Sequence, residues 1–341
     1  MAGLQIGLRA VACVRFILLL LHEFVYTARM MSTLSTPERM LHAVLLLIAT
    51  AFLLACGTAP FIFNGLIAIG RAVPMLEGLR DLYFEEVISR LALIYLLLGF
   101  YPAVRLAGAR SMAEFGLVGG VRWTREIVRG WLAGILSVGL LFVIAWLSGA
   151  YVWAPDAWGR VAGRVAGYLV GGLLIGLIEE TFFRGALFGL LRRIVAWLPA
   201  ALAVSVFFSL VHFLRPEHPT GIVHGHWYSG FRLIPHLVRV THDVEFYFPF
   251  ALTLLLMGLV LCALYRRQGH IYFIIGLHAG WVLMLQGGRR FFDRDPDVLG
   301  WLFGASDNMG RSWAATALLA GLFIATLCLP KGGRTCHRCP T

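Results

Sequence analysis

The sequence contains few charged residues, since Asp, Glu, Lys and Arg make up 14% of its 341 residues. A soluble domain carries roughly 25% charged residues, so this scarcity argues against a soluble globular protein. Hydrophobic residues make up 59% of the chain, and the mean hydropathy is +0.80. No long polar segment separates the apolar runs. The composition therefore predicts a polytopic membrane protein.

Acidic residues are the scarcer of the charged types. The chain has 18 Asp and Glu against 29 Lys and Arg, which gives a formal net charge of +11. In a soluble protein this excess would suggest nucleic acid as a partner. Here the arginines lie mainly between apolar runs, where they orient membrane spans. We therefore expect the lipid bilayer, and not nucleic acid, as the partner.

Cysteines at metal-site spacing are also few. Cys336 and Cys339, in the tail KGGRTCHRCPT, supply only half of a usual zinc site. The fourth position from the end is Arg338, so the tail is not a prenylation box. The other four cysteines lie in apolar stretches, where a thiol behaves as a small hydrophobe: Cys13, Cys56, Cys262 and Cys328. We expect no cofactor and no bound metal.

Eight apolar runs are candidates for membrane-spanning helices. A span needs about 20 apolar residues, and its backbone must satisfy its own hydrogen bonds in lipid. We predict an all-α bundle of about eight transmembrane helices with the site in a cavity inside it. Residues 41–329 form this single domain, between an N-terminal segment (1–40) with no assigned role and a short cytoplasmic tail (330–341). The runs are 41–63, 91–104, 131–153, 162–182, 198–214, 246–265, 271–287 and 313–329.

Arginine excess marks every second loop along the chain. It appears in residues 105–130, 183–197 and 266–270, and again in the tail. The intervening loops are more balanced in charge. Arginine-rich loops face the cytoplasm by the positive-inside rule, so we expect both termini to be cytoplasmic. One balanced loop, residues 215–245, is rich in histidine, but the histidine spacing matches no standard metal site.

Two acids and an arginine interrupt the fourth run, in the stretch GLIEETFFRGALFG. A charge inside a span costs about 2.5–3.5 kcal/mol on insertion scales, so such residues usually face the bundle interior and serve a function. Glu180 and Arg184 are spaced i and i+4, which places them on one helix face and allows an ion pair. Glu179 lies about 100° around the helix. We therefore interpret Glu180 and Arg184 as support and Glu179 as the free carboxylate.

Two histidines on other runs are expected at a similar depth. The fourth and fifth runs form a hairpin that turns near residue 196, and Glu179 and His212 lie about equally far from this turn. His278 lies near the middle of the seventh run. A lone histidine in an apolar run is usually a packing residue. Two of them at the level of a Glu-Glu pair predict a shared polar site within the membrane.

These residues resemble the CAAX protease and bacteriocin-processing family (CPBP or Abi), also called type II CAAX proteases. The family motif Glu-Glu-x-x-x-Arg is matched from Glu179 to Arg184, and the motif Phe-x-x-x-His is matched by Phe208 and His212. The third motif, His-x-x-x-Asn, is matched at His278 only. The resemblance covers roughly residues 130–287, and it implies a glutamate-type intramembrane endopeptidase without an obligatory metal.

The resemblance also implies roles for the individual residues. Glu179 would act with His212 to activate a water molecule, and His278 would help to stabilise the oxyanion formed at the peptide carbonyl. Glu180 and Arg184 would order the site. The implied substrates are peptides or proteins with a membrane-associated tail or leader. Because the family is prevalent in bacteria, the resemblance also implies a prokaryotic inner membrane.

The chain departs from the third motif at Val282, where the family has asparagine. Losing one oxyanion donor typically costs about 10²–10³ in rate. Trp281, Gln286 or a backbone N–H are candidate replacements. The departure also leaves two alternatives open: a catalytically weak or inactive membrane scaffold or immunity-type protein, and a hydrolase in which two histidines and a glutamate bind zinc.

Overall fold

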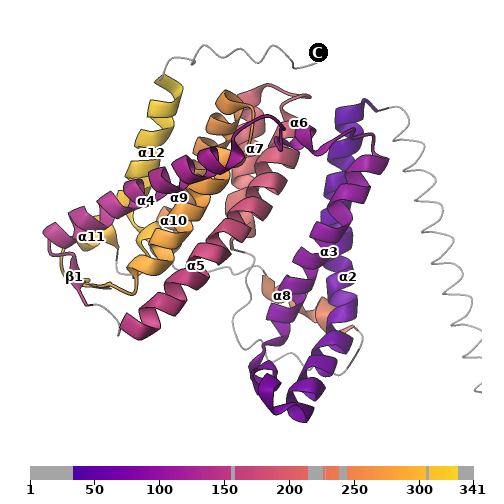
Figure 1. The fold of residues 1–341 in the computed structure, drawn as a ribbon, viewed down its shortest axis with the longest axis horizontal. Coiled ribbons are helices and arrows are strands. Elements are labelled where there is room, and N and C mark those ends of the chain that lie inside the picture. The colour runs from indigo at the N-terminus through magenta and orange to yellow at the C-terminus, as the bar shows by residue number, and fades with distance from the viewer. Residues whose placement is uncertain are drawn as a thin grey trace, which may run out of the picture.

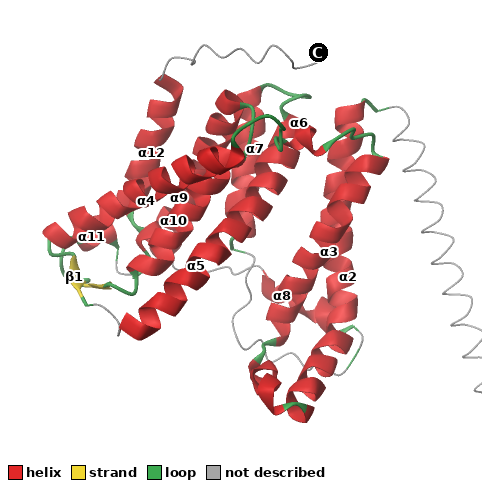
Figure 2. Cartoon of the chain, viewed as in Figure 1, coloured by secondary structure: helices red, strands yellow, loops and turns green. Residues whose placement is uncertain are grey.

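The fold is an all-α bundle (Figures 1 and 2). The computed structural model describes residues 34–154, 158–213, 226, 228–237, 244–304 and 307–328. The tail with Cys336 and Cys339 lies outside the described residues, as do residues 1–33 with Cys13. Of the histidine-rich loop, only His226 and His236 are described. The described strands, β1 (Tyr151–Trp153) and β2 (Phe292–Arg294), form one short antiparallel pair.

Apolar helices occupy all eight predicted runs, and the described part of the chain is that of an integral membrane protein. Five helices, at Thr36–Ala72, Phe84–Leu106, Trp123–Leu147, Gly163–Leu191 and Tyr247–Gln268, are long and apolar enough to span a membrane, and three are shorter.

The helices are α2 (Thr36–Ala72), α3 (Phe84–Leu106), α4 (Trp123–Leu147), α5 (Trp158–Glu179), α7 (Trp197–Val211), α9 (Val244–Gln268), α10 (Tyr272–Gly288) and α12 (Trp313–Cys328). Short segments complete the described elements: η1 (Pro74–Asp81), η2 (Met112–Phe115), η3 (Glu180–Phe188), α6 (Gly189–Leu191), η4 (Ser229–Leu233), α8 (Ile234–Leu237), α11 (Gly300–Phe303) and η5 (Met309–Arg311).

The second helix begins earlier than the apolar run suggested. We expected residues 91–104, whereas α3 begins at Phe84 and includes Glu85 and Glu86 in its first turn. Acidic residues are favourable there because the first turn exposes N–H groups and carries the positive end of the helix dipole. Apolar composition alone therefore placed the start of this helix too late.

The α2–α3 hairpin stands beside the rest of the bundle (Figure 1). One half of this hairpin has a hydrophobic core of its own. In this core Phe63 and Phe84 pack edge to face, and Leu233 of η4 is buried nearby. The other half joins the main core through Val44 and Val104. The main core also contains residues of the helices at the fourth, fifth and seventh apolar runs, which carry the predicted polar residues.

Helix α10 lies at unusually short range from α4. A Cβ atom added at Gly130 would lie 1.9 Å from the carbonyl oxygen of Phe273, and one added at Gly276 would lie 1.9 Å from that of Ile127. Such small residues let membrane helices pack backbone to backbone. On its other side, α10 meets α5 at Gly176, where an added Cβ would lie 2.8 Å from the carbonyl oxygen of Ile275. Close packing on both sides thus fixes the position of α10.

Candidate active site

The helix with the two acids changes its winding between them. Glu179 is the last residue of α5, and Glu180 begins the π-helical segment η3 (Glu180–Phe188), which continues into α6. π-Helical turns are rare and frequently occur at functional sites. Most of η3 is buried, and Gly185 packs against the backbone of Phe115 in η2. The irregular turn therefore lies in the protein interior and not against lipid.

Glu180 and Arg184 form the ion pair that their spacing predicted. Arg184 Nη1 donates to Glu180 Oε1 at 2.9 Å, and both side chains are fully buried. The guanidinium also lies 4.4 Å from the centre of the Phe208 ring on α7, within the range of a cation–π interaction. The prediction that this pair acts as internal support is consistent with its geometry.

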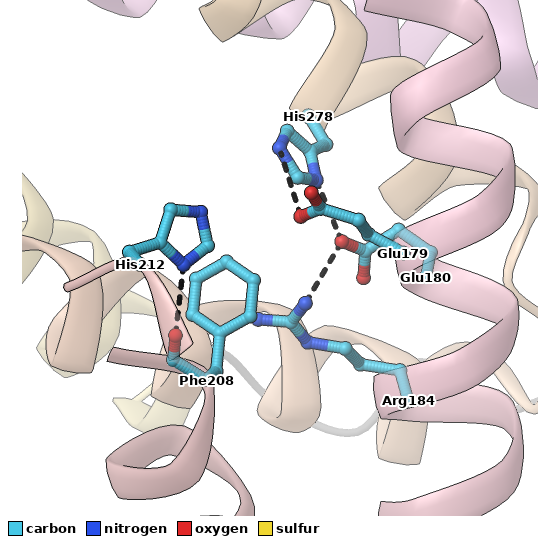
Figure 3. Close-up of polar contacts among 6 residues, drawn as sticks. All are labelled: Glu179, Glu180, Arg184, Phe208, His212 and His278. Atoms are coloured by element: carbon cyan, nitrogen blue, oxygen red, sulfur yellow. Dashed lines mark hydrogen bonds and ion pairs between the residues drawn. The ribbon is translucent and has the colours of Figure 1, made fainter. Parts of the chain in front are cut away.

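His278 connects both glutamates. Its Nδ1 lies 2.7 Å from Glu180 Oε1, and its Nε2 lies 3.9 Å from Glu179 Oε2 (Figure 3). An ionised carboxylate only accepts hydrogen bonds, so Nδ1 is the donor in the first contact. His278 is 4% exposed, whereas the Glu179 side chain is 27% exposed. Glu179 is therefore the more accessible carboxylate, and His278 is oriented toward it by Glu180.

His212 lies at the C-terminal end of α7, next to Phe208. Its Nδ1 lies 2.8 Å from the backbone carbonyl oxygen of Phe208, so Nδ1 donates to that oxygen. The His212 and Phe208 ring centres are 4.5 Å apart. Figure 3 shows Phe208 between His212 and Arg184. The structure thus brings all five predicted polar residues into one region, from η3, α7 and α10 and the last residue of α5.

The site lacks the amide that the third family motif would supply. Val282 is half-buried and faces α5, where a Cβ added at Gly172 would lie 3.5 Å from Val282 Cγ1. The indole N–H of Trp281 donates to Ser137 Oγ on α4 at 3.0 Å. Gln286 is exposed, about one turn beyond Val282 along α10. Of the two side chains considered as replacements, Trp281 is therefore already engaged elsewhere.

The residues that the structure describes contain no group of three His, Cys, Asp or Glu side chains arranged to hold a metal ion. Glu179 and His278 approach each other, but His212 does not complete a set of ligands with them. This donor arrangement does not fit the zinc hydrolase that we considered as an alternative.

The helices and the buried acid–histidine cluster define a membrane protein with a buried polar site. Residues 161–284 match the family model described as type II CAAX prenyl endopeptidase Rce1-like. This segment contains every residue of the candidate site, and the match bears out the resemblance to this family. At the level of the family, it supports a CAAX-type intramembrane protease. The comparisons with curated proteins and with solved structures gave no match.

Proposed function

We propose that this protein is an intramembrane endopeptidase that hydrolyses a peptide bond in a membrane-delivered peptide or protein tail. The observation that carries the proposal is the approach of Glu179 Oε2 to His278 Nε2 at 3.9 Å, beside the buried Glu180–Arg184 pair. A carboxylate that is partly accessible and faces an oriented imidazole is suited to acid–base chemistry on a water molecule.

In the proposed reaction, Glu179 accepts a proton from water while the water oxygen bonds to the peptide carbonyl carbon. His212 acts together with Glu179 on this water molecule. The carbonyl oxygen becomes an oxyanion, and the Nε2–H of a protonated His278 donates to it. The C–N bond then breaks, and the proton held by Glu179 passes to the leaving amine.

The substrate class follows from the family and from the place of the site. Prenylated tails, leader peptides and C-terminal sorting signals all reach a protease from the membrane. Apolar helices surround the site, so a tail that partitions into lipid can reach it without crossing water. We further propose a prokaryotic inner membrane with both termini cytoplasmic, because arginine-rich loops alternate with balanced loops.

The test compares membranes from cells that express the native protein or the Glu179→Gln variant. We expect a membrane-anchored precursor to accumulate in the variant, identified by mass spectrometry of peptide termini. The matched control is Glu86→Gln, which changes a half-buried glutamate paired with Arg90 on α3. Unchanged termini in the Glu179→Gln membranes, with the protein present at the native level, would refute the proposed activity.

One observation favours a second candidate, a catalytically weak or inactive scaffold or immunity-type protein. Val282 places an apolar side chain against α5 at the motif position where the family has an amide. In this candidate the buried ion pair only fixes helix packing. The biological effect of the protein would then persist in Glu179→Gln and disappear when the Glu180–Arg184 pair is broken.

A further inference from the structure

Phe208 on α7 stands between the two parts of the candidate site (Figure 3). One part is the acid–histidine cluster that includes the Glu180–Arg184 pair, and the other part is His212. The centre of the Phe208 ring lies 4.4 Å from the guanidinium carbon of Arg184 and 4.5 Å from the centre of the His212 ring. Phe208 is fully buried. One aromatic ring therefore contacts both parts of the site.

The Phe208 ring is itself held from the side of η3. Phe183 packs against it edge to face, with ring centres 5.0 Å apart and an interplanar angle of 88°, which is a favoured arrangement of aromatic pairs. The Arg184 guanidinium lies over the same ring, in a cation–π contact that is strongest where water is excluded. Because side chains in a close-packed core occupy single rotamers, the Phe208 ring has little freedom to turn.

His212 meets Phe208 in two ways. Its Nδ1 donates to the backbone carbonyl oxygen of Phe208 at 2.8 Å, and its imidazole packs on the Phe208 ring at an interplanar angle of 57°. Their i,i+4 spacing places both side chains on one face of α7. The carbonyl contact fixes one nitrogen but allows the imidazole plane to turn, whereas the ring contact limits that turn. A substitution of Phe208 keeps the carbonyl and removes the ring, so the two contributions can be separated.

The ring contact matters because His212 stands where α7 ends. Helix α7 ends at Val211, and His212 is its C-cap residue. Helix ends fray, so the backbone holds a side chain there less firmly than in the middle of a helix. Contact with the Phe208 ring, which belongs to the main hydrophobic core, ties His212 to the rest of the bundle.

We propose that Phe208 is a positioning residue, whose ring holds the His212 imidazole at a fixed place relative to the Glu180–Arg184 pair. The inference rests on the proposed function for its catalytic consequence, whereas the placement of His212 can be tested without it. If Glu179 and His212 act on one water molecule, their geometry must be held within roughly 0.5 Å. A displacement of about 1 Å can cost about 10² in rate. Loss of the ring should therefore slow the chemical step and leave substrate binding unchanged.

The test uses the full-length protein in membranes and two matched variants. Phe208→Leu removes the ring and keeps the backbone carbonyl. Phe142→Leu removes a similarly buried ring from α4, where it packs with Tyr151 and Phe292. If Phe208→Leu does not accumulate in membranes, Phe208→Met replaces it, because the unbranched methionine side chain adapts to the space that the ring leaves.

The first measurement needs no substrate. Diethyl pyrocarbonate acylates imidazole nitrogens, and peptide mapping compares its reaction at His212 with that at His236, an exposed histidine on α8. Removing the Phe208 ring uncovers one face of the His212 imidazole. We therefore expect the relative labelling of His212 to rise several-fold in Phe208→Leu and to stay at the native level in Phe142→Leu. Equal labelling in all three proteins would overturn the proposal.

The second measurement is cleavage, at several concentrations, of the precursor that accumulates in Glu179→Gln. We expect kcat of Phe208→Leu to fall about tenfold with KM unchanged, and both constants of Phe142→Leu to stay at the native values. A purely structural role would impair the two variants alike. Equal losses of kcat in both, or a change in KM alone, would overturn the catalytic consequence. If no precursor accumulates, the proposed function fails, while the labelling still decides whether the ring places His212.

Discussion

His278 donates a 2.7 Å hydrogen bond to Glu180, a residue 98 positions earlier in the chain. The same Glu180 oxygen also accepts from Arg184 at 2.9 Å. One carboxylate oxygen therefore ties α10 to the π-helical segment and orients the imidazole toward Glu179. In this arrangement Glu180 has a structural role, which leaves Glu179 as the carboxylate that can take part in chemistry.

Glu180→Gln should destabilise the protein strongly. The substitution leaves the fully buried Arg184 without its counter-ion, and breaking a buried pair costs about 3–5 kcal/mol. The measurement is reversible unfolding in mixed detergent micelles. Glu86→Gln is the control, because its exposed i,i+4 pair with Arg90 is worth only about 0.3–0.5 kcal/mol. Similar losses in the two variants would contradict the supporting role of Glu180.

Gly276→Ala should reduce both stability and cleavage. The new Cβ would lie 1.9 Å from the carbonyl oxygen of Ile127, so α10 must move away from α4 and carry His278 with it. Gly287→Ala on the same helix is the control, because an added Cβ there meets nothing within 4 Å. Thermal unfolding and precursor cleavage measure the two effects. A Gly276→Ala protein as stable and active as Gly287→Ala would show that α10 need not be held at this distance.

Val282→Asn should increase cleavage if the site is an active but donor-poor protease. The new amide would stand at the motif position of the family asparagine, and one oxyanion donor is worth about 10²–10³ in rate. Val282→Thr is the control, since it keeps the shape of valine without supplying an amide. Initial rates on the accumulated precursor provide the measurement. Equal rates for Asn and Thr would indicate that another group already donates to the oxyanion.

His212→Gln should lower cleavage by about 10²–10⁴, the usual contribution of a general acid–base residue, while the protein unfolds as before. Stability is retained because His212 is only partly buried and lies at the C-terminal end of α7. His236→Gln, at an exposed position on α8, controls for loss of a histidine. A variant that cleaves normally would remove His212 from the mechanism.

Stability should fall as the pH drops below about 6.5, the ordinary pKa of histidine. His270 lies in the turn between α9 and α10, and partial burial lowers its pKa. The folded state then binds a proton less readily than the unfolded state, so its stabilising contribution is present above the unfolded pKa and is lost on acidification. Unfolding of the native protein and of His270→Asn at pH 5 and pH 7.5 measures the effect. The variant should show the smaller difference between the two pH values.

The helices and the ion pair were predictable from the sequence, because both depend on local patterns. Runs of apolar residues located all eight helices, and i,i+4 spacing identified the Glu180–Arg184 pair. The contact between His278 and Glu180 was not predictable, since it depends on how α10 packs against α5. The position of His278 along its helix placed it at a depth similar to that of the two glutamates. That position did not show whether Glu179 or Glu180 would be its partner.

The π-helical winding of η3 was also hidden from the sequence. A π turn differs from an α turn by the packing around it, and no residue type encodes it reliably. The position of Trp281 was missed for the same reason, as its donor is used by Ser137 on α4.

The tight glycine contacts of α10 with α4 and α5 leave that helix little freedom to shift. Any change in the geometry of the site would therefore arise in another element, and η3 is the irregular one, because a π turn contains one residue more than the α-helix around it. Migration of that surplus residue along the segment would rotate Glu180 relative to Arg184 while the backbone of α10 stays in place. The winding of one turn could in this way set whether the imidazole is presented to a substrate.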